Sequence, residues 1–263
     1  MAGNWEDLKP RVLSGAAMAV VGILAIVVGG VWFQMLAVFV TAVMVWECWI
    51  MIRGASPITG MLLAAAVSSI LSAQVFKAAL GPEFLLLFLV VPVIGALVLK
   101  REKLTFFGFA LALQVAGWGL VHFRIDYGFT WLMWLVSIVV VTDIAGYFAG
   151  KSLGGPKFWP AVSPKKTWSG TAGGWIGAAL VGALFAMFTN AGWTIVLLSV
   201  VISFAGQMGD IAESAFKRRQ GAKDSSTLIP GHGGLFDRFD ALLGASLFLL
   251  LVAAVFNVPG VAF

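Results

Sequence analysis

Long apolar runs separated by short polar stretches are the main pattern of the chain. Nine such runs are bounded by charged residues, glycine or proline, and they cover residues 12–29, 31–52, 58–76, 83–99, 104–122, 129–149, 171–189, 192–211 and 241–258. A helix of about 20 apolar residues crosses the hydrocarbon core of a bilayer. The runs are longer than the roughly ten-residue alternating segments of an outer-membrane barrel. The pattern therefore predicts an all-α polytopic membrane protein with about nine transmembrane helices.

The composition excludes the soluble and the disordered classes. Hydrophobic residues make up 60% of the 263 positions and charged residues 11%, whereas soluble domains carry about 25% charged residues. Disordered chains lack the apolar residues that dominate this sequence. We therefore expect a single membrane domain over residues 1–263, in which residues 1–130 form N-terminal spans and residues 131–263 carry the polar motifs.

The basic residues predict the orientation in the membrane. With nine spans and a cytoplasmic N-terminus, all but Lys77 and Arg124 of the 17 Lys and Arg residues fall on the cytoplasmic side. Cytoplasmic loops carry such an excess of Lys and Arg. The net charge of +5 is then a topology signal that needs no nucleic-acid partner. The cytoplasmic set is Lys9, Arg11, Arg53, Lys100, Arg101, Lys103, Lys151, Lys157, Lys165, Lys166, Lys217, Arg218, Arg219, Lys223 and Arg238.

Charged residues gather in one segment near the C-terminal end. Residues 207–240 hold ten of the 17 basic and 12 acidic residues, five of each sign. A segment that only set the topology would be basic. Mixed charge at a membrane surface therefore indicates chemistry with a metal ion and phosphate groups.

Helical spacing places part of this segment on one face. Gly206, Asp210, Glu213, Ser214 and Lys217 follow the i, i+4, i+7, i+8, i+11 pattern of a continuous helical stripe. Two further acidic residues, at positions 237 and 240, are i, i+3 neighbours where the last span begins. The glycine-rich segment 221–234 between the two helices can expose backbone N–H groups. Together these parts could surround a metal-bound polyphosphate.

Two further polar patches are predicted to face the same side. Asp143, Gly146, Tyr147 and Gly150 form a stripe at the end of the sixth span, and an aspartate inside an apolar span is a functional hypothesis by default. Residues 163–170 then supply hydroxyls, two lysines and helix N-terminal amides before the seventh span, which is a plausible anion site.

The motifs resemble those of bacterial phosphatidate cytidylyltransferases, also called CDP-diacylglycerol synthases. Residues 214–218 (SAFKR), 223–224 (KD) and 230–240 (PGHGGLFDRFD) are similar to the signature of that family. Residues 143–147 (DIAGY), 163–168 (SPKKTW) and 206–213 (GQMGDIAE) resemble the family too, in the family's order. One departure is Ser169, where relatives often carry Glu or Gln. The first 130 residues resemble the family only as hydrophobic spans.

The resemblance implies an activity, a cofactor and partners. In this family CTP reacts with phosphatidic acid to give CDP-diacylglycerol and pyrophosphate, with the help of a divalent cation. The implied cofactor is Mg²⁺ or Mn²⁺, as one ion or two. The partners would be CTP, phosphatidic acid and membrane lipids, with no nucleic acid, and a homodimer is plausible. The implied location is the bacterial cytoplasmic (inner) membrane, with the active site on the cytoplasmic side, where CTP is found.

The residues receive roles on this basis. Asp210 and Asp237 are expected to be the principal metal ligands, and the further candidates are Asp240, Asp143 and Asp224. The groups expected to hold the triphosphate or the leaving pyrophosphate are Lys217, Arg218, Lys223, Arg238 and His232. The other expected substrate-binding residues are Ser163, Lys165, Lys166, Ser214, Gly233 and Gly234.

Other functions remain open on the sequence alone. A different CTP-dependent lipid transferase or a lipid-alcohol kinase would use similar groups, and a kinase would release CDP instead of pyrophosphate. An ion-coupled transporter could line its path with Asp143, Asp210 and Glu213, although the sequence shows no internal repeat. Glu47, in an apolar run, is as compatible with helix packing as with function. The roles of Asp224 and Glu213 also stay open.

Overall fold

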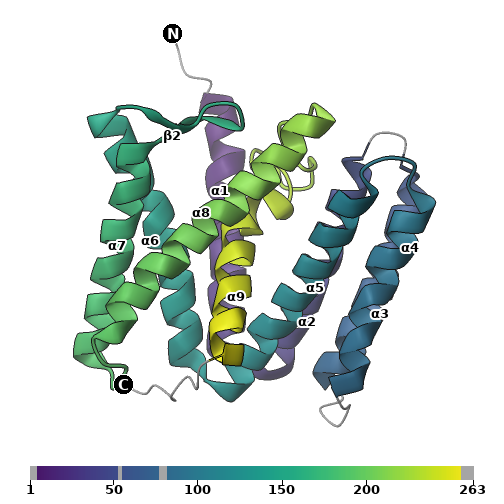
Figure 1. The fold of residues 1–263 in the computed structure, drawn as a ribbon, viewed down its shortest axis with the longest axis horizontal. Coiled ribbons are helices and arrows are strands. Elements are labelled where there is room, and N and C mark those ends of the chain that lie inside the picture. Colours follow the sequence, from purple (N-terminus) through teal and green to yellow (C-terminus); the bar gives the residue numbers. More distant parts are fainter. Residues whose placement is uncertain (1–4, 53–54, 77–81, 256–263) are drawn as a thin grey trace. The chain divides into compact units, whose positions relative to one another are not determined.

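The computed structural model describes residues 5–52, 55–76 and 82–255, which are almost entirely helical (Figure 1). Arg53 and Lys77, which count toward the predicted orientation, lie outside the described residues. The helices are α1 (Trp5–Val28), α2 (Gly30–Ile50), α3 (Pro57–Phe76), the 3₁₀ helix η1 (Pro82–Leu89), α4 (Val90–Val98), α5 (Lys103–Asp126), α6 (Phe129–Leu153), α7 (Trp168–Phe188), α8 (Thr194–Gln220) and α9 (Phe236–Val255).

These helices confirm the prediction of an all-α polytopic membrane protein. Seven of the described helices, α2, α3 and α5 to α9, are long and apolar enough to cross a bilayer. Two shorter apolar helices, Val12–Val28 and Phe84–Val98, correspond to the first and fourth predicted runs. The total of nine spans and the side of the N-terminus stay predictions.

Two helices differ from the apolar runs that predicted them. The fourth run divides into η1 and α4. Pro92 lies in the first turn of α4, where a backbone N–H would have no intrahelical acceptor, so the N–H that proline lacks is not needed. The helix α8 continues beyond the apolar run to Gln220, because the charged residues after position 211 are themselves good helix formers. It is followed by Gly221, which has a positive φ of 68° and so ends the helix.

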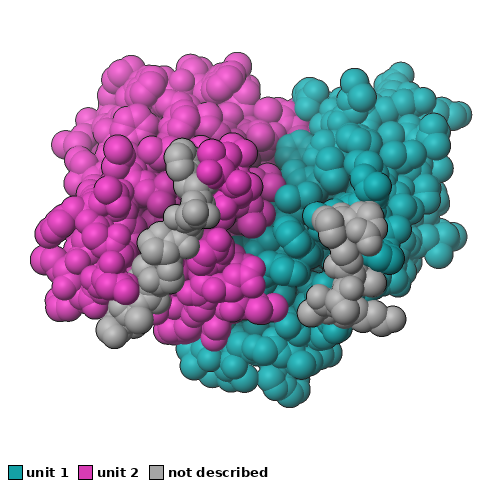
Figure 2. Space-filling view, turned by 60° about the horizontal axis from the view of Figure 1, so that its bottom comes forward, with its two compact units in different colours: residues 1–122, 219–239 teal, residues 123–218, 240–263 magenta. Residues whose placement is uncertain are grey.

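The chain divides into two compact units, coloured separately in Figure 2. Unit 1 comprises residues 1–122 and 219–239, and unit 2 comprises residues 123–218 and 240–263. Both units therefore combine segments that are distant in the sequence. The prediction of one membrane domain divided near residue 130 stays a prediction.

Within unit 1, the helix α2 packs against α1 and α3, and α3 packs against α4. Small residues let aromatic rings lie close to neighbouring helices. Gly60 of α3 faces the ring of Trp49, and Gly95 of α4 faces the ring of Phe106. Trp49 and Phe106 are buried and meet edge to face, with 5.1 Å between ring centroids. The core of unit 1 is thus built around α2.

Within unit 2, the helices α6 and α7 pack closely through small residues. Gly146 and Gly150 of α6 lie against the backbone of Gly170, and Gly177 of α7 lies against Ala145. Small residues allow such close contact between the backbones of membrane helices. Any added side chain in this seam would meet the opposite helix.

A small β-hairpin joins α6 to α7, and the sequence pattern does not predict it. Its strands, β1 (Lys157–Trp159) and β2 (Ser163–Thr167), pair antiparallel. Thr167 then caps α7, because its Oγ1 accepts a hydrogen bond of 3.1 Å from the backbone N–H of Gly170. The strands are too short to show an alternating pattern. The hairpin fixes both predicted lysines of the loop, Lys165 and Lys166, on β2.

The helices α8 and α9 approach each other backbone to backbone in unit 2. A Cβ atom at Gly209 would lie 2.9 Å from the Cα of Gly244 and would overlap the carbonyl oxygen of Asp240. Gly206 of α8 similarly lies against the carbonyl oxygen of Ala241. Glycine at these positions therefore brings the start of α9 within reach of the acidic stripe of α8.

Gly209→Ala should lower both the melting temperature and any activity that depends on the acidic residues. The added methyl group would force α8 and α9 apart, and such overpacking costs about 1–3 kcal/mol. Gly108→Ala, in the helix α5, is a matched control, because nothing lies within 4 Å of a Cβ atom added at Gly108. Thermal unfolding should show an unchanged or raised midpoint for the control. Equal midpoints in the two variants would contradict the close contact.

Candidate active site

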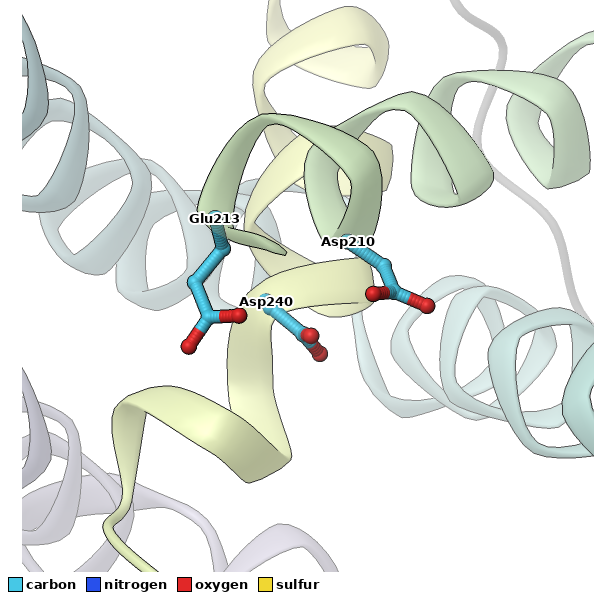
Figure 3. A group of neighbouring side chains, drawn as sticks. All are labelled: Asp210, Glu213 and Asp240. Atoms are coloured by element: carbon cyan, nitrogen blue, oxygen red, sulfur yellow. The ribbon is translucent and has the colours of Figure 1, made fainter. Parts of the chain in front are cut away.

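Three carboxylates meet where α8 and α9 approach each other. Asp210 and Glu213 come from α8 and Asp240 comes from α9, and one oxygen of each lies within 4.8 Å of the others. Figure 3 shows the three side chains projecting to the same side, with Asp240 between the other two. The i, i+3 spacing on α8 and the glycine contact with α9 thus place three hard oxygen donors together.

Lysine side chains flank this cluster. Lys166 of β2 forms an ion pair with Asp210, and the Nζ of Lys217 lies 2.5 Å from Glu213 Oε2. Glu213 is fully buried and Lys217 nearly so. The hydroxyl of Ser214 donates to Asp210 Oδ1 at 3.2 Å. Asp240 also interacts electrostatically with Asp210 and Lys217.

The cluster fits a divalent cation. Three carboxylates and two lysines leave one excess negative charge, and adjacent carboxylates repel one another unless a positive charge lies between them. Carboxylate oxygens are the ligands that Mg²⁺ prefers, with water and substrate phosphates completing its coordination. Asp210, Glu213 and Asp240 could therefore hold such an ion. Glu213, whose role the sequence left open, joins the predicted Asp210 and Asp240.

A pocket of about 350 Å³ in unit 2 adjoins the cluster. It brings together three motifs that are separate in the sequence, namely the stripe of α6, the lysines of β2 and the acidic face of α8. Lys151 adds a third cation to its wall, and a site with several lysines beside carboxylates suits a phosphate bound together with a metal ion. Its polar lining includes Asp143, Tyr147, Lys151, Lys165, Lys166, Gln207 and Asp210. Ser163 opens β2 and is not among the lining residues.

The glycine-rich segment lies in unit 1, where Asp237 organises it. We call residues 221–235 the signature loop. Asp237 Oδ2 accepts three hydrogen bonds of 2.8 Å, from the backbone N–H and hydroxyl of Ser225 and from the N–H of Gly234. Gly233 has a φ of 80°, and a Cβ there would meet Asp237 Oδ2 at 2.5 Å. Only glycine fits this turn without strain.

His232 of the signature loop is oriented by the N-terminal helix. Ser14 Oγ of α1 donates to the carbonyl of Pro230 at 3.0 Å and lies 2.8 Å from His232 Nδ1. When the hydroxyl proton goes to the carbonyl, Nδ1 is the donor in the second contact. Arg238 Nε in turn donates to the carbonyl oxygen of His232 at 3.1 Å. No pattern in the sequence points to Ser14, because it lies 218 positions from His232.

Glu47 of α2 also reaches the signature loop. Its carboxylate accepts hydrogen bonds from the backbone N–H of Leu235 and Phe236 and from the hydroxyl of Ser226. The sequence marked this residue only as an unusual charge in an apolar run. Its contacts are with the motif that carries the family resemblance, so it belongs among the candidate functional residues.

The predicted site residues thus fall into two groups. Unit 2 holds Asp143, Ser163, Lys165, Lys166, Asp210, Ser214, Lys217, Arg218 and Asp240. Unit 1 holds Lys223, Asp224, His232, Gly233, Gly234, Asp237 and Arg238. Lys223, Arg218 and Arg238 are exposed. Arg219, by contrast, lies 3.7 Å from Glu102, which is an ion-pair contact within unit 1. Metal binding by Asp237 and Asp143 stays a prediction.

Comparison with known proteins gives one family. The model described as the cytidylyltransferase family matches residues 9–256. The phosphatidate cytidylyltransferase of Bacillus subtilis (strain 168) is 31% identical over 267 residues, which cover 95% of this chain and 99% of the relative.

Other relatives match over a shorter stretch. The phosphatidate cytidylyltransferase of Brucella suis biovar 1 (strain 1330) is 48% identical over 137 residues, which is 51% of each protein. That of Staphylococcus epidermidis (strain ATCC 12228 / FDA PCI 1200) is 35% identical over 159 residues, which is 57% of this chain and 61% of the relative. The chain thus spans about half the length of the Brucella relative that it matches. Because the family model extends over nearly the whole sequence, the chain belongs to the cytidylyltransferase family.

Proposed function

We propose that this chain is a phosphatidate cytidylyltransferase, which transfers CMP from CTP to phosphatidic acid and releases pyrophosphate. The observation that carries the proposal is the cluster of Asp210, Glu213 and Asp240 beside a lysine-lined pocket. The names of the relatives support the same activity. A kinase of a lipid alcohol would use CTP too, but the relatives from Bacillus, Brucella and Staphylococcus are all named phosphatidate cytidylyltransferases.

The reaction needs no covalent enzyme intermediate. An oxygen of the phosphatidic acid phosphate attacks the α-phosphorus of CTP, and a new P–O bond forms. The bond from the α-phosphorus to the bridging oxygen breaks, and pyrophosphate leaves with that electron pair. The protein's work is positioning and neutralisation of charge, which dominate catalysis of phosphoryl transfer in general.

A divalent cation, Mg²⁺ or Mn²⁺, would neutralise triphosphate charge when bound. Asp210, Asp240 and Glu213 would hold it. Lys217 holds Glu213 in place by its ion pair. Lys166, already paired with Asp210, and Lys165 would bind a substrate phosphate. Lys223 and His232 of the signature loop and Arg238 of α9 would bind the triphosphate and the leaving pyrophosphate.

The two substrates suggest where the reaction occurs. Phosphatidic acid keeps its acyl chains in the bilayer, and CTP is a polar molecule of the cytosol. The proposal therefore places the reaction at the cytoplasmic face of the bacterial inner membrane. A homodimer is compatible with the proposal but no part of the reaction needs one.

Purified protein in detergent, given CTP labelled at the α-phosphate, phosphatidic acid and Mg²⁺, should form a labelled lipid and unlabelled pyrophosphate. A chelator should stop the reaction, and added Mg²⁺ should restore it. Release of CDP in place of pyrophosphate would favour a kinase. Absence of labelled lipid under conditions in which the protein stays folded would refute the proposed function.

A further inference from the structure

Glu47 is a buried carboxylate in a predicted membrane span, three residues before α2 ends at Ile50. Its exposed fraction is 0%. A carboxylate inside an apolar helix is costly unless several donors satisfy its oxygens. The donors that surround it therefore show what keeps it there.

The donors come from two separate parts of the signature loop and the start of α9. Oε1 accepts from the hydroxyl of Ser226 at 2.6 Å and from the backbone N–H of Leu235 at 3.0 Å. Oε2 accepts from the N–H of Phe236 at 2.7 Å, and the hydroxyl of Ser225 lies 3.4 Å away. One side chain thus joins the beginning of the loop to its end.

The backbone groups held by Glu47 are those that a helix start leaves unsatisfied. The first N–H groups of a helix have no intrahelical acceptor and carry a partial positive charge. A residue beside the helix in sequence could cap them, but Glu47 lies 189 positions from Phe236. Because Glu47 of α2 accepts these hydrogen bonds, the loop is attached to a helix in the core of unit 1.

The loop packs tightly against Glu47 at Gly234. A Cβ atom at Gly234 would overlap both Glu47 Oε1 and Ser225 Oγ. Ser225 also donates to Asp237 Oδ2 at 2.8 Å, so the two carboxylates hold neighbouring points of the same loop. Phe236, the first residue of α9, is buried and meets Phe109 edge to face at 5.6 Å.

We infer that Glu47 is a positioning residue, which holds the signature loop in the conformation that binds the triphosphate of CTP. The inference rests on the proposed function for the identity of the ligand, but the holding itself follows from the hydrogen bonds. Glu47 would touch neither substrate. It acts through Leu235 and Phe236, which follow the glycines of the loop directly.

Glu47→Gln is the decisive variant because it keeps the size of the side chain. Two backbone N–H groups can only donate, and the amide offers one oxygen in place of two. One of the two backbone N–H groups, that of Leu235 or that of Phe236, would therefore face the NH₂ group of the glutamine and lose its hydrogen bond. Glu47→Asp retains the charge but is one methylene shorter, so it should restore little.

The control is Gln114→Leu, a change at another buried polar residue of unit 1. Gln114 donates to the carbonyl oxygens of Phe88 and Ala110, and both of these acceptors lie outside the loop. Its loss should lower the melting temperature, as the loss of Glu47 should. A purely structural role for Glu47 would then make the two variants alike in every other measurement.

A spin label at position 228 reports the state of the loop without any substrate. Leu228 is exposed within the loop, and the native Cys48 is fully buried, so a Leu228→Cys variant should label at the new position. The label should be immobile in the Leu228→Cys protein alone and when Gln114→Leu is added to it. It should be mobile when Glu47→Gln is added. The KM for CTP should rise about tenfold or more in Glu47→Gln, while the KM for phosphatidic acid should change by less than about twofold.

An immobile label in Glu47→Gln would overturn the inference, whatever the enzyme does. A mobile label with an unchanged KM for CTP would overturn the link to the triphosphate. If the parent forms no labelled lipid from CTP, the proposed function fails, and the label alone then decides whether Glu47 holds the loop.

Discussion

Asp240→Asn is expected to reduce the rate of CMP transfer about 100-fold or more, while the thermal stability of the protein stays the same or rises. Loss of a charge that holds a catalytic cation removes several kcal/mol of transition-state stabilisation, and a 100-fold loss corresponds to about 2.7 kcal/mol. The measurements are initial rates with labelled CTP and thermal midpoints with and without Mg²⁺.

The expected stability follows from the geometry of the cluster. Asp240 has carboxylate oxygens of Asp210 and Glu213 within 4.8 Å, so removing its charge relieves repulsion between like charges. The backbone N–H of Ala241, which donates to Asp240 Oδ1 at 2.7 Å, can still donate to the amide oxygen of Asn. A lost fold therefore cannot be the reason for lost activity.

Mg²⁺ provides a readout that does not depend on turnover. A cation that binds only the folded protein raises its melting temperature, so Mg²⁺ should stabilise the parent and have a weaker effect on Asp240→Asn. Asp126→Asn, an exposed change at the end of α5, is the control and should behave like the parent. Equal Mg²⁺ stabilisation of parent and Asp240→Asn would contradict the assignment of Asp240 as a ligand.

The spans and the acidic stripe could be predicted because both depend on local spacing. Every predicted apolar run corresponds to a helical segment of the described chain. Asp210 and Glu213 share a face of α8 because they are three residues apart, whatever surrounds them. The contact between α8 and α9 could be predicted only in part. The small residues of α8 indicate that another helix packs closely against it, but they do not identify that helix.

The contacts of the signature loop could not be predicted, because they join residues distant in sequence. Glu47 and Phe236 are 189 positions apart, and Ser14 and His232 are 218 apart. A charge in an apolar run shows that some partner must exist. It does not identify the partner, and a single serine in α1 gives no signal at all. Such pairings are set by packing of the whole unit rather than by local pattern.

Asp237→Asn is expected to leave the signature loop in place and yet reduce transfer about 100-fold. The sequence assigns Asp237 as a principal metal ligand, and in the structure its Oδ2 holds the loop through Ser225 and Gly234. The amide oxygen of Asn can still accept from those groups, whereas its charge is gone. Asp237→Ala removes both, so it should also free the loop.

The label at position 228 and the Mg²⁺ dependence separate the two roles of Asp237. If the charge of Asp237 helps to bind the cation, Asp237→Asn and Asp237→Ala should lose activity to the same extent, and both should need a higher Mg²⁺ concentration. Only Asp237→Ala should make the label mobile. If Asn keeps near-native transfer at the same Mg²⁺ concentration, Asp237 holds the loop and its assignment as a ligand is wrong. In that case the cation would depend on the carboxylates of unit 2, because Asp210, Glu213 and Asp240 already supply the oxygen donors that a Mg²⁺ ion requires from a protein.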